Sequence, residues 1–434
     1  MSEDQIVQRI YIKGELELIS PLVIGSGEDD NSDIDVVRDW QGNPIIPGTS
    51  LAGAIRHNII EHYVNGISVT DKIFGEHGKT SRISQLLFYD ATMNGTANVL
   101  IRDGVHLDYD TRTVVDKKVD KFSKYDYEIL EPGQKFIFRL EAVRRQNVET
   151  TQDELNDVVH AILHSLKNSE IAVGAKTRRG LGVVKLVSEQ ILLLDLTKSE
   201  DATKWLRFEW QTMAANKKLE DLKTGTLKPL NNKEHIQVEF NIPYSILIRH
   251  YNAEFKDVDS SHIQSMGQSV IPGTSWNGAV RHAVHQILLD LGVNDNRKVK
   301  EIEHDIFGYA SERDEHSHAS KLTVKESLID GGKGLLKYTR NKVDRFTGGV
   351  AEGALFDEMP HYQGSVKLNI FLKLDDSEKD KWKIGLIKLA LKDIGNGIQP
   401  VGGDANIGRG ILEHKSDIFI DNNHLKALAL KLKE

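Results

Sequence analysis

One segment of this 434-residue chain occurs twice, and it contains the residues best suited to bind an anion. Ile46–His57 reads IPGTSLAGAIRH and Ile271–His282 reads IPGTSWNGAVRH, so nine of the twelve positions are identical. Pro-Gly predicts a turn, and the Thr or Ser that follows predicts the N-cap of a helix, whose start offers free N–H groups, a hydroxyl and a positive dipole end. We expect either a bound phosphate there or a simple capped helix with an exposed arginine. The residues concerned are Ser50, Arg56, Ser275 and Arg281.

A loop rich in carboxylates follows the first apolar strand. Gly25-Ser26-Gly27 leads into EDDNSDIDVVRD, which runs from Glu28 to Asp39. Carboxylates can hold a divalent cation or accept a proton during catalysis. The loop is not an EF-hand, because it lacks the glycine and the terminal glutamate of that motif in every register. The residues alone leave two interpretations open, a functional acid or an ordinary solvated loop.

Each half also ends in a glycine loop with the spacing G-x5-G-x-G. Residues 174–182 read GAKTRRGLG, and residues 402–410 read GGDANIGRG. Glycines let the backbone approach a phosphate closely, and basic residues between them add charge. A solvated turn that joins a helix to a strand is the alternative. The candidate phosphate-binding residues are Lys176, Arg178, Arg179 and Arg409.

These landmarks recur in one order, which indicates an internal duplication. DKIFG at Asp71–Gly75 corresponds to DIFG at Asp305–Gly308, and VDKF at Val119–Phe122 corresponds to VDRF at Val343–Phe346. Each half reads strand, helix, strands, helix, strand, which predicts an α+β fold of two tandem ferredoxin-like or RRM-like (βαββαβ) domains. The predicted domains are residues 1–195 and 234–434, joined by a charged linker or linking helix at 196–233.

Composition sets further limits. The chain has 39% hydrophobic residues, no cysteine and a formal net charge of −8. No apolar run approaches the length of a membrane span, and the N-terminus lacks signal-peptide architecture, so we expect a cytoplasmic protein with no membrane partner. Without cysteine, disulfides and thiolate zinc sites are excluded. The acidic charge argues against coating nucleic acid with the whole surface, although a basic groove stays compatible with it.

In combination, the motifs resemble one family. A Gly-x-Gly loop after the first strand, D-x-x-[VI]-x-[KR]-[DE], IPG[ST]S-x-x-G-x-x-R, VDRxTG and a final G-x5-G-x-G are similar to the repeat-associated mysterious protein (RAMP) superfamily, specifically to backbone subunits of type III CRISPR effector complexes. The likeness covers nearly the whole chain, twice, and implies a tandem fusion of two backbone domains of the type III-D-like kind. The implied partners are CRISPR guide RNA, complementary target RNA, a large polymerase-like subunit, a handle-capping subunit, small helical subunits and further backbone subunits.

The resemblance also implies an endoribonuclease activity. It places a catalytic aspartate, with a divalent metal ion (Mg²⁺ or Mn²⁺), at Asp33. The 2′-hydroxyl of the target RNA would attack the adjacent phosphate and leave a 2′,3′-cyclic phosphate and a 5′-hydroxyl. Hairpin thumbs that flip a target nucleotide fall on residues 111–127, the first thumb, and 338–356, the second thumb. Their phenylalanines would stack on bases or pack inside the thumb, and the thumb residues singled out are Lys121, Phe122, Arg345 and Phe346.

The second half departs from the pattern at the acidic loop. Arg249-His250-Tyr251 stands where the first half has its Gly-x-Gly, and no [KR]-[DE] pair follows its acidic residues. Counting forward from the strand end matches Asp257 to Asp33, whereas counting back from Pro272 gives Val258. Asp257 is therefore the preferred second catalytic residue, with Asp259 behind it, and a half that binds guide RNA without cutting is the alternative.

Three other functions stay open at the level of sequence. These are a non-catalytic guide-binding scaffold, a guide-processing endoribonuclease that depends on a histidine general acid–base, and a single-stranded RNA-binding module of another system. Two interpretations are also open for three histidines, which either bind a metal or belong to an exposed polar insertion: His304, His316 and His318.

Overall fold

The computed structural model describes residues 5–25, 34–75, 83–105, 124–250, 258–309 and 317–433, without the side chains of residues 124 and 352–354. The chain forms two compact units. The first comprises Met1–Ile101, Asp126–Thr177 and Leu181–Asn231, and the second comprises Arg102–Tyr125, Arg178–Gly180 and Asn232–Glu434. The second unit therefore includes two short segments from the first half of the sequence.

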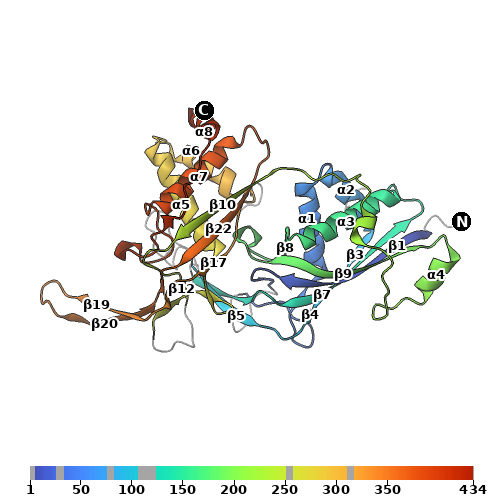
Figure 1. Cartoon of the computed structure of the whole chain (residues 1–434), viewed down its shortest axis with the longest axis horizontal. Coiled ribbons are helices and arrows are strands. Elements are labelled where there is room, and N and C mark those ends of the chain that lie inside the picture. The colour runs from blue at the N-terminus through green and yellow to red at the C-terminus, as the bar shows by residue number, and fades with distance from the viewer. Residues whose placement is uncertain are drawn as a thin grey trace. The chain divides into compact units, whose positions relative to one another are not determined.

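The first unit is an antiparallel sheet with helices on it (Figure 1). Its central strand β1 (Ile6–Leu18) pairs with β7 (Lys135–Arg145) on one side and with β9 (Val183–Asp195) on the other. The sheet order is β2-β4-β7-β1-β9-β8, with β2 Ile45–Ile46, β3 Leu86–Phe88 (paired with β7), β4 Ala91–Asn94 and β8 Ile171–Ala172. Apolar residues at alternate positions of β1 are buried, as their spacing predicts: Ile10, Ile12, Leu16 and Leu18.

Helices α1 (Gly48–His62) and α3 (Gln152–Lys167) supply the other layer of this core, and α2 (Gly66–Ile73) follows α1. The amphipathic pattern of the sequence predicts a helix from roughly Thr151 to Lys167, and the bounds of α3 confirm it to within one residue. Thr151 and Glu154 form a capping box, in which each side chain accepts the other residue's backbone N–H at 3.1 and 2.8 Å.

The second unit repeats this plan. Strand β10 (Lys233–Asn241) lies between β22 (Ser365–Lys373) and β23 (Glu413–His414), in the sheet order β14-β15-β17-β22-β10-β23. The corresponding minor strands are β14 Gln264–Ser265, β15 Gln268–Ile271, β16 Leu322–Val324 (paired with β22) and β17 Ser327–Asp330, and the helices are α5 Gly273–Asp290, α6 Asn296–Phe307, α7 Lys381–Gly395 and α8 Asn422–Lys433. The two sheets share one strand order, so the predicted α+β fold of two ferredoxin-like domains is confirmed.

Smaller ribbons extend from each sheet. In the first half β5 (Val99–Val105) pairs with β6 (Lys124–Leu130), and the residues between them, 106–123, lie outside the described part. In the second half β19 (Tyr338–Val343) and β20 (Val350–Met359) form a hairpin that projects from its unit (Figure 1). Short strands at its base are β11 Ser245–Ile246, β12 Arg249–His250, β13 Ser260–His262, β18 Gly334–Leu335 and β21 His361–Tyr362.

The segment from 196 to 231 is folded against the first unit. It contains α4 (Ser199–Leu206) and a 3₁₀ turn at Leu219–Leu222, whose two leucines are buried in the first core. Upstream of that turn, Phe208 stacks on Tyr11 of β1 with ring centroids 3.8 Å apart. These apolar contacts hold most of the stretch predicted as a linker on the surface of the first domain.

Candidate functional site

The ends of the first acidic loop are held against the base of the first thumb. Asp33 and residues 26–32 lie outside the described residues, so the anchors on either side define the place. The N–H of Val37 donates to the carbonyl of Ile24 at 2.9 Å, and the N–H of Glu128 in β6 donates to the carbonyl of Ile34 at 2.9 Å. The Glu128 carboxylate in turn accepts the N–H of Val36 at 3.0 Å. The two ends of the loop are therefore paired with each other, and the second end lies beside β6.

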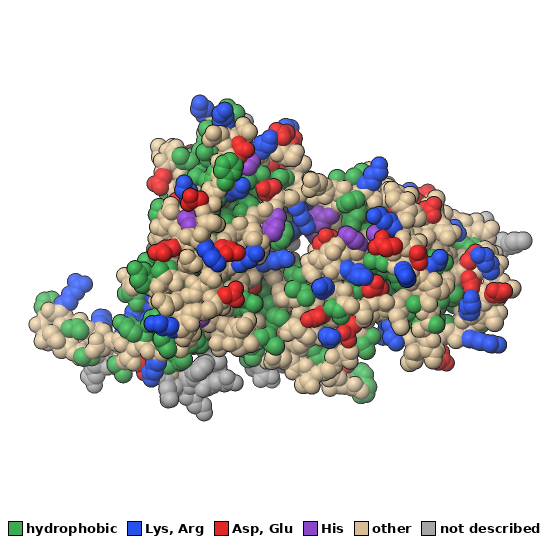
Figure 2. All heavy atoms as spheres, in the orientation of Figure 1, with side chains coloured by type: hydrophobic (Ala, Val, Ile, Leu, Met, Phe, Trp, Pro, Cys, Tyr) green, Lys and Arg blue, Asp and Glu red, His purple; other side chains and the backbone are tan. Residues whose placement is uncertain are grey.

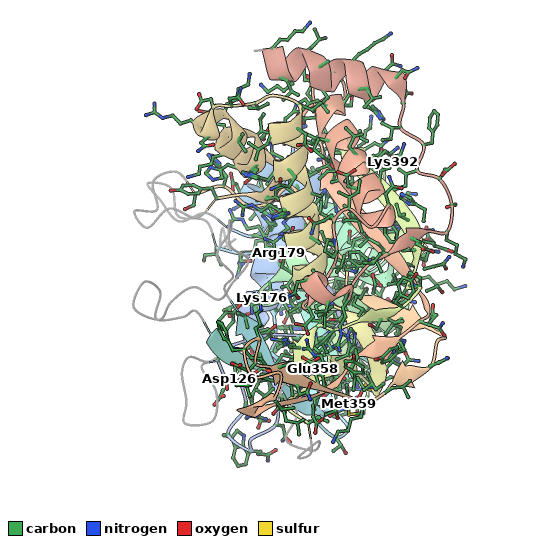
Figure 3. The ribbon with its side chains drawn as sticks, turned by 90° about the vertical axis from the view of Figure 1, so that its left-hand side faces the viewer. Asp126, Lys176, Arg179, Glu358, Met359 and Lys392 are labelled. Carbon is green, nitrogen blue, oxygen red and sulfur yellow. The ribbon has the colours of Figure 1, made fainter. Side chains whose placement is uncertain are left out.

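The first glycine loop packs on the same strand end. The N–H of Ala175 donates to the carbonyl of Val23 at 2.8 Å. A Cβ on Gly174 would lie 2.1 Å from that carbonyl oxygen, and its φ is +82°, so only glycine fits. This packing carries Lys176, labelled in Figure 3, to the base of the thumb, where its Nζ lies 3.5 Å from the ring centroid of Tyr127 in β6. Burial lowers the pKa of Lys176 to about 8.

The second glycine loop has the same backbone but the opposite charge at one position. The N–H of Gly403 donates to the carbonyl of Leu247 at 2.8 Å, as Ala175 does to Val23. When the two loops are matched glycine by glycine, Asp404 (φ 58°) stands where Lys176 (φ 56°) does. The Asp404 carboxylate lies 2.8 Å from the Arg249 guanidinium. This half therefore places an acid where the first places a base.

Asp404 belongs to a buried group of charges at the base of the second thumb. Its centre is Glu358 of β20, labelled in Figure 3, which is only 3% exposed. The Glu358 carboxylate lies 2.9 Å from Arg409 of the glycine loop and 2.7 Å from Arg340 of β19. Arg409, predicted to bind phosphate, is thus 4% exposed and ion-paired. Glu358 and Asp404 were not among the residues predicted from the sequence, although the Lys-to-Asp change is visible when the two glycine loops are matched residue by residue.

The structure describes one of the two candidate catalytic aspartates of the second acidic loop. Asp257 lies outside the described residues. Asp259 is exposed, and its carboxylate accepts the N–H of Asp357 in β20 at 2.9 Å, while its own N–H donates to the Asp357 carbonyl at 2.7 Å. Asp259 therefore ties its loop to the thumb.

The repeated helix starts are built differently from the expectation. The prediction that Thr or Ser forms the N-cap is wrong: α1 begins at Gly48 with Pro47 in the cap position, and α5 begins at Gly273 with Pro272 there. Tertiary packing is the reason, because a Cβ on Gly48 would meet the Phe88 carbonyl at 2.3 Å, and the Gly48 N–H is taken by the Asp90 carboxylate at 2.7 Å. Ser50 and Ser275 are half-buried, and their N–H groups donate to Pro47 and Pro272 at 3.0 Å.

The arginines of the same motif pair with the helix that follows. Arg56 lies 2.9 Å from Asp71 of the DKIFG motif, and Arg281 lies 3.3 Å from the buried Glu303 of α6. These contacts join α1 to α2 and α5 to α6. In the first half this ion pair links the two repeated motifs, and in the second half it links the first motif to α6 two residues before DIFG.

The remaining two basic candidates lie in the 3₁₀ turn Thr177–Arg179, and both are half-buried. Arg178 and Arg179 belong to the second unit, where the Arg179 carbonyl lies 2.1 Å from the place a Cβ on Gly273 would take. Burial, and then the charge of Arg281, lower the pKa of Arg179. An anion close to this arginine would offset that repulsion.

The tip of the second thumb presents an aromatic ring to solvent. The Asp344 carboxylate accepts the N–H groups of Phe346 and Thr347 at 2.9 and 2.8 Å, which shapes the turn. Phe346 is 99% exposed, so its ring does not pack inside the thumb, and Arg345 beside it is exposed as well. Their first-half counterparts, Lys121 and Phe122, lie outside the described residues.

The histidine-rich insertion shows ordinary packing in the part that is described. The His304 ring stacks on Tyr309 at 4.5 Å, and the backbone of His318 pairs with Tyr309, whereas His316 lies outside the described residues. Within the ranges that the structure describes, no three His, Asp or Glu side chains converge as metal ligands. Figure 2 shows acidic and basic side chains interspersed over the visible face.

The fold and the duplicated landmarks define a tandem of two RRM-like domains. A family model of the RAMP superfamily matches residues 15–185 and, separately, residues 240–413. The chain therefore belongs to the RAMP superfamily, and the resemblance stated from its motifs is confirmed at that level. Membership implies a CRISPR-associated RNA-binding subunit, with CRISPR RNA and other subunits of the complex as partners. No curated protein matches the chain, and no helix among the described residues is long and apolar enough to cross a membrane.

Proposed function

We propose that this chain is a double backbone subunit of a type III CRISPR complex, which binds guide RNA and cleaves complementary target RNA. The observation that carries the proposal is the convergence in the first half. There the ends of the acidic loop at Ile24 and Ile34, the thumb base at Glu128, and the glycine loop at Ala175 meet through backbone hydrogen bonds. A scaffold would need the fold and the basic loop, but it would not need a carboxylate-rich loop at the thumb base.

The proposed reaction uses the nucleophile that RNA carries. The 2′-oxygen of a flipped nucleotide gives up its proton, forms a bond to the adjacent phosphorus, and displaces the 5′-oxygen, which leaves as a hydroxyl. Asp33 is the proposed acceptor of the proton or ligand of a divalent cation, Mg²⁺ or Mn²⁺. When bound, such a cation would offset the charge that develops on the phosphoryl oxygens. DNA lacks the 2′-hydroxyl and should not be cut.

For the second half, the engagement of its acids favours a role without cleavage. Asp259 is engaged with Asp357, and Asp404 and Glu358 neutralise the arginines at the thumb base. We therefore propose that the first half cuts and that the second half holds guide RNA. Asp257 is the residue on which this division depends.

The test is cleavage of end-labelled complementary RNA by the assembled, guide-loaded complex. The chains compared are the wild type, Asp33→Ala, Asp257→Ala and the double variant, with Glu378→Ala as an exposed acidic control. Binding of target RNA is measured for each. We expect Asp33→Ala to lose one cut with binding intact and Asp257→Ala to cut as the wild type does. If every variant cuts like the wild type, the chain is a scaffold, and if Asp257→Ala loses a different cut, both halves are nucleases.

The proposed partners follow from this role. They are the guide and target RNA, the large polymerase-like subunit, a handle-capping subunit, small helical subunits and further backbone subunits. Purification of the tagged chain with its co-expressed locus, followed by identification of the retained RNA and proteins, checks this set. Retention of repeat hairpin RNA with cleavage of that hairpin would instead favour a guide-processing endoribonuclease.

A further inference from the structure

The backbone holds Lys176 in an unusual conformation for a lysine. Its φ is +56°, in the left-handed region that residues with a Cβ rarely adopt. The conformation follows from the packing of Gly174 and Ala175 on Val23, which leaves little freedom for the next residue. The strand end that this loop touches leads directly into the acidic loop. The geometry therefore aims one lysine at the base of the first thumb.

The side chain of Lys176 is placed with its charge partly out of water. Its ammonium lies over the ring of Tyr127 at 3.5 Å, and the side chain is half-buried. Burial disfavours the charged form, which lowers the pKa of this lysine to about 8. A cation that has lost part of its hydration interacts more strongly with an approaching anion than a solvated lysine does.

The second half carries different residues at the same position. Leu130 forms a β-bridge with the chain just after the first strand, and His361 pairs with the same place in the second half. Tyr127 lies three residues before Leu130, and Glu358 lies three residues before His361. Tyr127 and Glu358 therefore correspond to each other. Lys176 and Tyr127 are thereby replaced by Asp404 and Glu358. Both acids are ion-paired with Arg340, at 3.5 and 2.7 Å. The duplication kept the loop's backbone and exchanged its charge.

We propose that Lys176 is a catalytic residue of the first half, whose ammonium contacts the RNA phosphate at the cut. There it stabilises the negative charge that grows on the phosphoryl oxygens as the 2′-oxygen attacks. This inference rests on the proposed function, because it requires that the first half cuts RNA. The role is electrostatic, so a guanidinium at the same position should replace much of it, and a neutral side chain should not.

The experiment is single-turnover cleavage of bound target RNA by the guide-loaded complex, with the dissociation constant measured alongside. Lys176→Met should slow the cut assigned to Asp33 by about 100-fold or more, as loss of one charge-stabilising donor does in other active sites. Its affinity for target RNA should stay within about threefold, and Lys176→Arg should recover most of the rate. The matched control is Lys185→Met, which removes an exposed lysine from β9 of the same half.

Each other outcome is decisive. If Asp33→Ala abolishes the cut and Lys176→Met does not slow it, the nuclease assignment stands and this inference is wrong. If Lys176→Met loses affinity in proportion to rate, or if Lys185→Met slows the cut equally, Lys176 is only one of several phosphate-binding lysines and the inference is again wrong. If the wild-type complex does not cut at all, the proposed function fails first and this inference fails with it.

Discussion

A buried histidine pair should make the second unit sensitive to acid. His262 of β13 is 1% exposed; its Nδ1 accepts the N–H of Ile248 at 3.1 Å, and its Nε2 lies 3.0 Å from the Val270 carbonyl, to which it must donate. This arrangement requires the neutral ring. Burial, and then the nearby His361, lower the pKa of His262 to about 3 from an ordinary 6.5. The unfolded chain therefore binds a proton that the folded unit excludes.

The size of the effect follows from proton linkage. Stability from the neutral ring is fully present above the unfolded pKa of 6.5 and is lost as pH falls toward the folded value of about 3. At about pH 5 the loss from His262 alone amounts to about 1.5 pH units at 1.36 kcal/mol each, or about 2 kcal/mol. The pKa of His361, also buried, is lowered too, so its contribution has the same sign.

The assay is denaturant unfolding at about pH 7.5 and pH 5, followed by tryptophan fluorescence. Trp276 and Trp382 are buried in the second core and report its unfolding once the other tryptophans are replaced by Phe: Trp40, Trp205 and Trp210. His262→Asn keeps an acceptor for the Ile248 N–H and removes the titrating ring. We expect the wild type to lose about 2 kcal/mol more than this variant over the interval. Equal losses in the two proteins would refute the reasoning.

Three further predictions concern charges and an exposed ring. Glu358→Gln should destabilise the second unit by about 3–5 kcal/mol, since it removes the closest acid from the buried Arg409 guanidinium; a loss under about 1 kcal/mol in denaturant unfolding, relative to the exposed control Glu378→Gln, would contradict the ion-pair account. The Asp157 carboxylate accepts N–H groups from residues 224–227, and although burial alone would raise its pKa, these hydrogen bonds hold the pKa well below the usual 3.8. Asp157→Asn should therefore cost the first unit about 2–3 kcal/mol above pH 4 and progressively less below it, as urea titrations across that range would show; a loss that does not shrink in acid would count against the charge. Phe346→Ala should leave thermal unfolding unchanged, because the ring is 99% exposed, and should weaken target RNA binding by about 5- to 100-fold if the ring stacks on a base; unchanged affinity would remove Phe346 from the RNA site.

Patterns that act locally along the chain were predictable. Alternation of apolar residues located β1, the amphipathic pattern located α3, and the repeated landmarks located two domains of one fold. The N-cap of α1 was mistaken because its acceptor, Asp90, comes from another part of the sheet. A rule based on local sequence predicts that the hydroxyl next to Gly48 caps the helix. In the fold, a carboxylate and a close carbonyl determine where the helix begins instead.

The sequence by itself determined the duplication, the order of elements and the family, because these depend on residue types at fixed spacings. Only the tertiary structure decided which neighbours each charged side chain has. Arg56 and Arg409 look alike in the sequence as candidate phosphate ligands, yet each is paired with an acid from a different element, Asp71 and Glu358. The ammonium of Lys176 lies over the ring of Tyr127, which also comes from another element. Charge pairing and desolvation depend on distances between elements far apart along the chain, and these distances exist only once the chain is folded.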